Sequence, residues 1–264
     1  LGVGAGNVPA YMEKSCDLEQ AVNDIVISKA FDNGMICASE QAVIIDAPIY
    51  EQAIKRFQKY NVHFLSATDK KKVEKFMFGV SSTDKNYADA VLNADVVGKS
   101  AEWIAEQCGV KVPKDTVILA AECKSVGPKE VLTREKLSPV LAVLKSKDSK
   151  EGIQLAVEMV QFNGMGHSAA IHTKSKEISE EFGKAVPAIR IIWNSPSTFG
   201  GIGNVYNDFI PSLTLGCGSY GKNSVGDNVG AVHLLNIKKI GRRNNNMQWF
   251  KVPQKIYFER NSVR

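Results

Sequence analysis

The chain has 264 residues, enough for one large domain or two ordinary domains with a substantial hydrophobic core. Its composition, 44% hydrophobic and 23% charged, is typical of a soluble globular protein, and no apolar run approaches the roughly 20 residues that cross a bilayer. The net charge of +5 is modest and its lysines are spread out, which favours a solvated surface or an anionic cofactor over a nucleic-acid partner.

The five cysteines are widely spaced, and no two of them form a C-x-x-C pair. Neither a zinc cluster nor a disulfide framework is therefore expected, and no metal site is predicted. A reducing cytoplasm fits this cysteine usage best. The chain begins with Leu and shows no signal-peptide pattern, so we expect it to be part of a longer protein.

Helices and strands are predicted to alternate from residue 17 onward. The expected helices cover residues 17–30, 48–60, 68–78, 100–108, 150–162 and 176–186. The expected strands cover residues 42–45, 62–65, 116–120, 140–144, 168–172 and 189–193. Because these strands are uniformly apolar, both faces should be buried, which predicts an α/β fold with a mostly parallel sheet covered by helices.

Two segments fall outside this alternation. Leu1–Pro9 is rich in glycine, but it lacks the glycine spacing of a dinucleotide-binding fingerprint. We expect a loop here, which either brings backbone close to a ligand or another segment or forms a tight turn. Residues 79–99 carry turn signals, and we assign them no element or role.

The character of the chain changes after Asn194. Glycine-rich loops are expected over residues 199–203 and 215–221. A basic, asparagine-rich linker then covers 242–246, and residues 255–260 are predicted to form a strand that begins a further unit.

A single cysteine follows the first predicted helix, on a turn that reads F-D-N-G-M-I-C-A-S-E-Q over residues 31–41. Gly34 would reverse the chain and present Cys37 among small and polar residues. Backbone N–H groups near such a turn can lower the pKa of a thiol and make it nucleophilic at neutral pH. Because free cysteine is also among the most buried residue types, position alone leaves Cys37 either a nucleophile or a small core residue.

Four histidines are candidates for acid–base chemistry. His63, His172 and His233 lie in or beside apolar segments, which is typical of structural histidines. His167 follows a double-glycine turn at the start of a strand, and loops at strand ends often carry sites in α/β folds. There it would act as a base or an acid near pH 7, or it would be structural like the others.

Five motifs occur in an order that resembles the CoA-acylating branch of the aldehyde dehydrogenase superfamily. They are the loop 4–9, the cysteine turn 31–41, E-K-L-S-P at 135–139, G-M-G-H at 164–167 and T-L-G-C-G-S at 214–219. The tail 247–264 resembles a bridge into an iron-dependent alcohol dehydrogenase domain, so the resemblance covers essentially the whole chain.

The resemblance implies a role for each matched residue. Cys37 would attack the aldehyde carbonyl, NAD would take hydride from the thiohemiacetal, and coenzyme A would take the acyl group from the thioester. His167 would assist proton movement, and the backbone N–H of Cys37 would donate to the oxyanion. Glu135 would hold the nicotinamide ribose, with Gly4 and Leu215 beside the cofactor ring.

One departure from the family pattern bears on the reaction. Hydrolytic aldehyde dehydrogenases carry a glutamate two residues before the paired glycines, where this chain has Val3, or Gly2 with a one-residue slip. Because neither residue can take a proton, attack by coenzyme A is favoured over attack by water. The implied reaction is acetaldehyde, coenzyme A and NAD to acetyl-CoA and NADH, run as acetyl-CoA reduction in fermentation.

The resemblance also implies a domain division and partners. Residues 1–10 would end the NAD-binding domain, 11–210 form the catalytic domain, 211–235 return to the cofactor domain, and 236–264 lead into the alcohol dehydrogenase domain. Most of the NAD-binding domain would precede this chain, so we expect weak or no activity from it alone. A homo-oligomer, and a helical filament of the longer protein, are expected.

Two other hypotheses remain open. The chain could be an assembly or filament module with the same fold and no catalysis. It could instead be part of a single-function acylating enzyme, which the tail after Trp249 argues against.

Overall fold

The computed structural model describes residues 3–244. The chain divides into two compact units, Leu1–Gly230 and Ala231–Arg264. Of the second unit, the described part holds one short 3-10 turn, Ala231–Leu234. The predicted strand over 255–260 lies outside the described residues.

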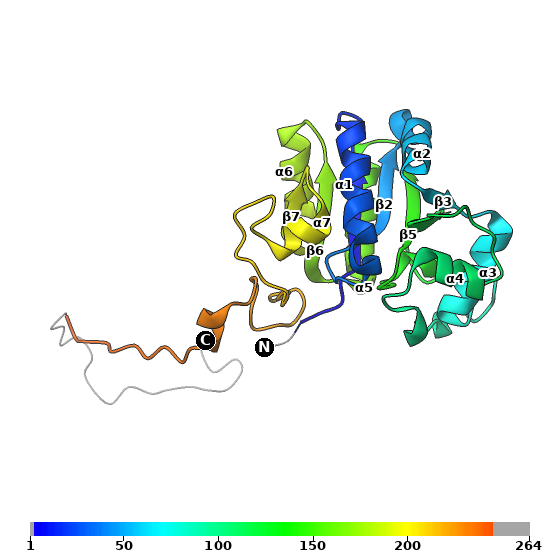
Figure 1. Ribbon diagram of the computed structural model, residues 1–264. Helices are drawn as coiled ribbons and strands as arrows, with labels where there is room; N and C mark the ends of the chain where they lie inside the picture. Colours follow the sequence, from blue (N-terminus) through cyan, green and yellow to red (C-terminus); the bar gives the residue numbers. More distant parts are fainter. Residues whose placement is uncertain (1–2, 245–264) are drawn as a thin grey trace, which may run out of the picture. The chain divides into compact units, whose positions relative to one another are not determined.

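Seven parallel strands form the sheet of the first unit, in the order β3-β4-β5-β2-β1-β6-β7 (Figure 1). The strands are β1 (Val8–Met12), β2 (Glu40–Asp46), β3 (Val62–Phe64), β4 (Ile118–Glu122), β5 (Val140–Ser146), β6 (Gly166–His172) and β7 (Ala188–Trp193). The predicted mostly parallel sheet and its six predicted strands are confirmed.

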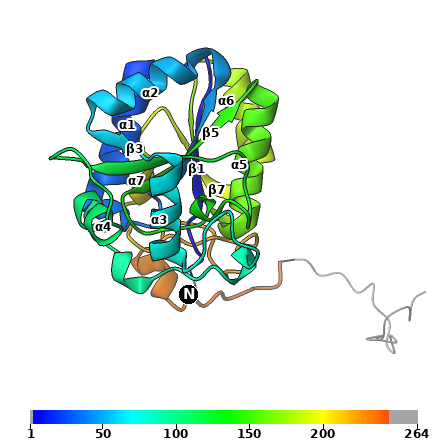
Figure 2. The same cartoon turned by 90° about the vertical axis from the view of Figure 1, so that its right-hand side faces the viewer.

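Helices cover both faces of this sheet. They are α1 (Leu18–Ala30), α2 (Tyr50–Lys59), α3 (Ala67–Phe78), α4 (Ala101–Gln107), α5 (Ser149–Asn163), α6 (Lys176–Ala185) and α7 (Ser197–Ile202). In Figure 2, α1 and α2 lie on one side of the strands and α5 and α6 on the other. Alternate residues of β2 follow this division, since Val43 and Ile45 pack with α1 and α2, while Ala42 and Ile44 pack in the core cluster that includes α5.

Short polar side chains start most of the predicted helices. Each accepts a hydrogen bond from a backbone N–H of the first turn, as N-caps do. The capping residues are Asp17, Ser66, Ser100, Asp148 and Ser175. The six predicted helices are therefore confirmed, with bounds shifted by one or two residues.

The structure corrects only the end of the predicted loop, because residues 3–7 form no helix or strand but β1 begins at Val8 and lies inside the sheet, between β2 and β6. Proline is normally excluded from central strands. Pro9 is tolerated because the register with β2 shifts between Val8 and Pro9, and pairing with β6 starts only at Ala10. The predicted boundary between residues 10 and 11 falls inside β1, and the domain division itself stays a prediction.

A second correction concerns residues 199–203, which were expected to be a loop and belong largely to helix α7. Its glycines serve close packing. A Cβ atom at position 201 would lie 2.8 Å from the Cβ atom of Ala38, so α7 approaches the segment after Cys37 closely. Among the described residues, no helix is long and apolar enough to span a bilayer.

Candidate active site

Most of the predicted site residues gather at one edge of the sheet. Cys37 precedes β2, Glu135 precedes β5, and His167 is the second residue of β6. The amino ends of neighbouring parallel strands meet at a common edge, which brings these segments together. The site therefore lies at the amino ends of the strands, opposite to the carboxyl edge where ligands usually bind in open α/β sheets.

The turn before Cys37 is built from left-handed backbone. Asp32, Asn33 and Gly34 have φ values of 49°, 50° and 69°. Asp and Asn tolerate this region better than other residues with a side chain, and glycine adopts it freely. At Gly34 a side chain is also excluded by space, since a Cβ atom would lie 2.6 Å from the carbonyl oxygen of Ser138. The amide of Asn33 donates to the carbonyl of Gly98 at 2.9 Å, so residues 79–99 brace the turn.

Cys37 is in direct contact with the glycine-rich loop. A Cβ atom at position 6 would lie 1.8 Å from the carbonyl oxygen of Cys37, and the N–H of Gly6 donates to Glu135 Oε1 at 2.8 Å. The loop was expected either to bring backbone close to a ligand or another segment or to form a tight turn. At Gly6 the backbone does approach another segment closely. Three segments distant in sequence thus meet at the cysteine.

Cys37 is partly exposed. Burial raises its pKa, and the negative charge of Glu135 raises it further. The backbone N–H of Cys37 and the charge of Arg190 act in the opposite direction. The expectation that the turn lowers the thiol pKa was wrong, because desolvation outweighs these two favourable contributions.

Glu135 is held by the residue that follows it. The buried ammonium of Lys136 donates to the carbonyl oxygens of Gln41, Leu132 and Arg134 at 2.9, 2.6 and 2.9 Å. Burial lowers the pKa of Lys136 well below its usual range. Glu135 is itself partly exposed, and burial raises the pKa of its carboxyl.

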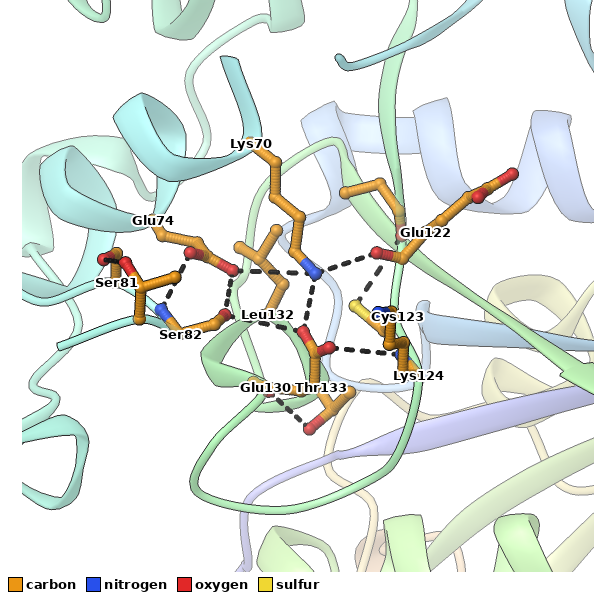
Figure 3. Close-up of polar contacts among 12 residues, drawn as sticks. Lys70, Glu74, Ser81, Ser82, Glu122, Cys123, Lys124, Glu130, Leu132 and Thr133 are labelled. Atoms are coloured by element: carbon orange, nitrogen blue, oxygen red, sulfur yellow. Dashed lines mark hydrogen bonds and ion pairs between the residues drawn. The ribbon is translucent and has the colours of Figure 1, made fainter. Parts of the chain in front are cut away.

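The loop that leads to Glu135 is tied to α3 by a cluster of charged and polar side chains (Figure 3). The Lys70 ammonium pairs with Glu130 at 2.6 Å and donates to the carbonyl of Glu122 at 2.8 Å. Glu74 accepts from the N–H and the hydroxyl of Ser82. The cluster joins α3, the start of residues 79–99 and the loop after β4.

Two buried ionisable residues, Lys29 near the end of α1 and Glu40 at the start of β2, lie on either side of Cys37 in the chain. The pKa of Lys29 is lowered to about 7 by burial, and that of Glu40 is raised to about 7 by burial. Glu40 accepts from the hydroxyl of Ser28 at 2.6 Å and from the N–H of Ser197 at 2.9 Å. These bonds connect α1, the start of β2 and α7. Sequence reasoning missed the pair, although a lysine within an apolar helix was a signal.

His167 is fully buried, and its Nδ1 lies 3.1 Å from the hydroxyl of Ser168. Burial lowers its pKa to about 4, and the charge of Arg190 contributes. Its Nε2 has no hydrogen-bond partner in the described part of the chain. The imidazole is therefore neutral at pH 7 rather than titrating there, and its catalytic role stays a prediction.

Gly4 and Leu215 belong to the same region. The N–H of Gly4 lies 3.3 Å from the sulfur of Cys217, and Leu215, which is 1% exposed, pairs with Asn228. A Cβ atom at Gly201 would lie within 4.0 Å of Leu215 and of the Ser168 hydroxyl. A Cβ atom at position 201 would also lie close to Ala38. The segment after Cys37, Leu215 and Ser168, whose hydroxyl lies beside the His167 ring, therefore meet around Gly201.

Arg190 of β7 is a site residue that sequence reasoning missed. It is 4% exposed, and its guanidinium donates to the carbonyl oxygens of His167 and Gly216 and to the side chain of Asn228. The available signal was a single arginine within an apolar strand.

The other histidines lie away from the cysteine turn in the chain. His63 is partly exposed in β3, and His172 is buried at the end of β6. His233 lies in the second unit.

Comparison with known proteins is consistent with this geometry. The aldehyde dehydrogenase family profile matches residues 3–205. The aldehyde-alcohol dehydrogenase of Streptococcus pneumoniae is 66% identical over 264 residues, which are 100% of this chain and 30% of that protein. The succinate-semialdehyde dehydrogenase (acetylating) of Clostridium kluyveri is 37% identical over 240 residues, which are 91% of this chain and 51% of that protein.

A solved structure shows the same fold. The acetylating aldehyde dehydrogenase from Geobacillus thermoglucosidasius superposes with a TM-score of 0.82 and 37% identity, over 92% of this chain and 53% of that chain. The present chain thus spans about a third to a half of the relatives it matches. It belongs to the aldehyde dehydrogenase family.

Proposed function

We propose that the chain supplies the nucleophilic part of a CoA-acylating aldehyde dehydrogenase that interconverts acetaldehyde, coenzyme A and NAD with acetyl-CoA and NADH. The observation that carries this is the partly exposed Cys37 at the sheet edge, whose carbonyl oxygen lies against Gly6, the residue that donates to Glu135. Two of the relatives named above are acetylating enzymes, which supports the choice of acyl transfer.

The proposed chemistry begins at the sulfur. The Cys37 thiol loses its proton and its sulfur bonds to the aldehyde carbon, giving a thiohemiacetal whose oxyanion the backbone N–H of Cys37 stabilises. His167 is proposed to assist proton movement as a neutral imidazole, and its lowered pKa makes it a weak base in this role. When bound, NAD accepts hydride from this carbon and coenzyme A takes the acyl group.

The residues present fit the proposed nucleotide. One oxygen of Glu135 is held by the N–H of Gly6, and its partly exposed carboxyl can accept a further bond from a ribose hydroxyl. Gly4 is also partly exposed, next to Cys217. Leu215 is buried in this chain, and its contact with the cofactor ring stays a proposal.

Acyl transfer rather than hydrolysis is supported at position 3. Val3 is 60% exposed on the loop that leads to Gly4 and Gly6. An aliphatic side chain there cannot activate water for attack on the thioester of Cys37. We therefore propose that coenzyme A is the acceptor.

The linked domain is supported by the longer relatives that are named aldehyde-alcohol dehydrogenase. We propose that an iron-dependent alcohol dehydrogenase domain is covalently linked to this chain. A homo-oligomer, and a helical filament of the longer protein, stay predictions from the family resemblance. All five cysteines are free, which supports a reducing cytoplasm.

The test uses the longer protein that contains this chain. NADH formation from acetaldehyde and coenzyme A is measured for the unaltered protein and for Cys37→Ser, with Cys108→Ser as the matched control. We expect Cys37→Ser to abolish NADH formation and Cys108→Ser to retain it. Equal activity of the two variants would rule the proposal out.

A further inference from the structure

Arg190 is a buried cation whose hydrogen bonds go to neutral oxygens. Its Nε donates to Asn228 Oδ1 at 2.6 Å, Nη1 to the carbonyl of His167 at 2.9 Å, and Nη2 to the carbonyl of Gly216 at 2.5 Å. A longer contact of 3.4 Å joins Nη2 to the carbonyl of Asp227. The planar fork of arginine suits such a set of divergent acceptors, and a lysine would satisfy fewer of them.

Asn228 extends this arrangement to the rest of the site. Its side-chain amide donates to the carbonyl oxygens of Gly201, Ile202 and Ile210 at 3.0, 3.3 and 2.8 Å. Arg190 and Asn228 therefore join β6, β7, the end of α7 and the segment 214–229. That segment contains Leu215 and Cys217. The hydrogen bonds of Arg190 and Asn228 therefore hold in place the segment on which these two residues lie.

The charge of Arg190 is not neutralised by a bonded carboxylate in the described part of the chain. The ionisable groups that act on it are Cys217, Cys37 and Asp227, and the Asp227 carboxylate is itself bonded to the N–H of Asn228. Lys70 offers a contrast, since its ammonium pairs directly with Glu130 (Figure 3). A buried charge without a bonded counter-ion favours negative charge that develops nearby.

Cys37 is the group on which this charge matters for the reaction. Contacts bring the two residues into one region, since Arg190 donates to the carbonyl of Gly216, the sulfur of the next residue lies 3.3 Å from the N–H of Gly4, and the same glycine loop lies against the carbonyl of Cys37. Glu135, Arg190 and Cys217 are among the ionisable groups that act on the Cys37 thiol, and Arg190 is the cation of these three. Arg190 also disfavours protonation of His167. One residue thus favours both the anionic sulfur and the neutral imidazole.

We propose that Arg190 is the positioning residue of this site, holding segment 214–229 against β6 and β7 and presenting a positive charge that favours the Cys37 thiolate. The proposal rests on the proposed function, in which Cys37 is the nucleophile. Arg190 would make two separate contributions. Its hydrogen bonds position segment 214–229, and its positive charge acts on the Cys37 sulfur.

Two variants of the full chain separate these contributions. Arg190→Lys keeps the charge and loses most of the fork, whereas Arg190→Met loses both. The rate of alkylation by iodoacetamide is measured against pH for each cysteine by peptide mass spectrometry. Cys37 reports the charge, and Cys217, which is fully buried beside Gly216, reports the packing of the segment.

We expect Arg190→Lys to leave the pH profile of Cys37 close to that of the unaltered chain and to make Cys217 reactive. Arg190→Met should also shift the Cys37 profile to higher pH, with alkylation near pH 8 slower by about tenfold for each unit by which the thiol pKa rises. Lys70→Met removes a partly buried cation that pairs with Glu130, and it should not shift the Cys37 profile.

Three outcomes would contradict the accounts in distinguishable ways. A Cys37 profile that is unchanged in Arg190→Met, with Cys217 still protected, would overturn this inference alone. A Cys37 that reacts no faster than Cys108 in the unaltered chain would count against the proposed function. If Arg190→Met unfolds, all cysteines react alike, and protection of Cys217 in folded Arg190→Lys would then overturn the inference.

Discussion

Gly6 lies against the carbonyl oxygen of Cys37 so closely that a Cβ atom at position 6 would stand 1.8 Å from it. The obstacle is backbone, which cannot rotate away as the end of a flexible side chain can. The glycine loop and the cysteine turn are therefore fitted to each other, and this contact sets where the thiol lies.

Gly6→Ala should destabilise the chain and displace the cysteine turn. Overpacking against backbone costs about 1–3 kcal/mol, and the hydrogen bond from Gly6 to Glu135 would be strained as well. Urea unfolding measures the loss. Gly183→Ala in α6 is the control, because its Cβ atom would meet Ile191 at an ordinary 3.9 Å. If both variants had the same free energy of unfolding, the cysteine turn would be able to move away from position 6 without destabilising the chain, which would contradict this prediction.

Glu135→Gln should make Cys37 more reactive. The carboxylate raises the thiol pKa, so removing its charge lowers that pKa, while glutamine can still accept from the N–H of Gly6. Alkylation of Cys37 near pH 7.5 should be faster by about threefold or more, since the rate follows the thiolate fraction. Glu122→Gln, at the end of β4, is the matched control. A slower reaction in Glu135→Gln would contradict the claim that the Glu135 charge raises the pKa of the Cys37 thiol.

His172 should contribute to acid destabilisation. Burial lowers its pKa from 6.5 to about 4, so the unfolded chain binds more protons between these values, and stability is lost as pH falls through this window. The full effect is about 3 kcal/mol. Urea unfolding at several pH values should show a shallower loss for His172→Leu than for the unaltered chain. Parallel curves would mean that His172 is not the group responsible.

Val3→Glu should raise hydrolysis in the longer protein. The substitution restores a carboxylate where hydrolytic members of the family carry their general base, so water could compete with coenzyme A for the acyl group on Cys37. Acetate formed from acetaldehyde and NAD without coenzyme A is the measurement, with Val3→Gln as the uncharged control. Absence of extra acetate would argue against the assignment of position 3.

The sequence was sufficient for most of the fold because the signals are local. Capping residues such as Asp17 and Ser100, together with apolar periodicity, locate the helices and strands. β1 was missed because Pro9 argues against a central strand unless the register shift beside it is known. α7 was missed because its glycines resemble a loop in the sequence. The reason for a glycine at position 201 is its close packing against Ala38, which lies 163 positions away in the chain.

The site was predictable only in part. Cys37 and Glu135 lie in recognisable motifs, and the structure brings them together. Arg190 stands out only as a single arginine within an apolar strand, and its role could not be predicted because it depends on carbonyl groups of His167 and Gly216 that only the folded chain brings together. The raised pKa of Cys37 was likewise out of reach, since burial depends on three segments distant in sequence.

The most direct test of the central claim is acyl transfer to Cys37. The longer protein is incubated with acetyl-CoA in the absence of NADH, and peptides are searched by mass spectrometry for an acetyl group that hydroxylamine removes. The account predicts acetylation of Cys37 and its loss in Cys37→Ser. Acetylation that is absent, or equal on Cys16 and Cys108, would contradict it.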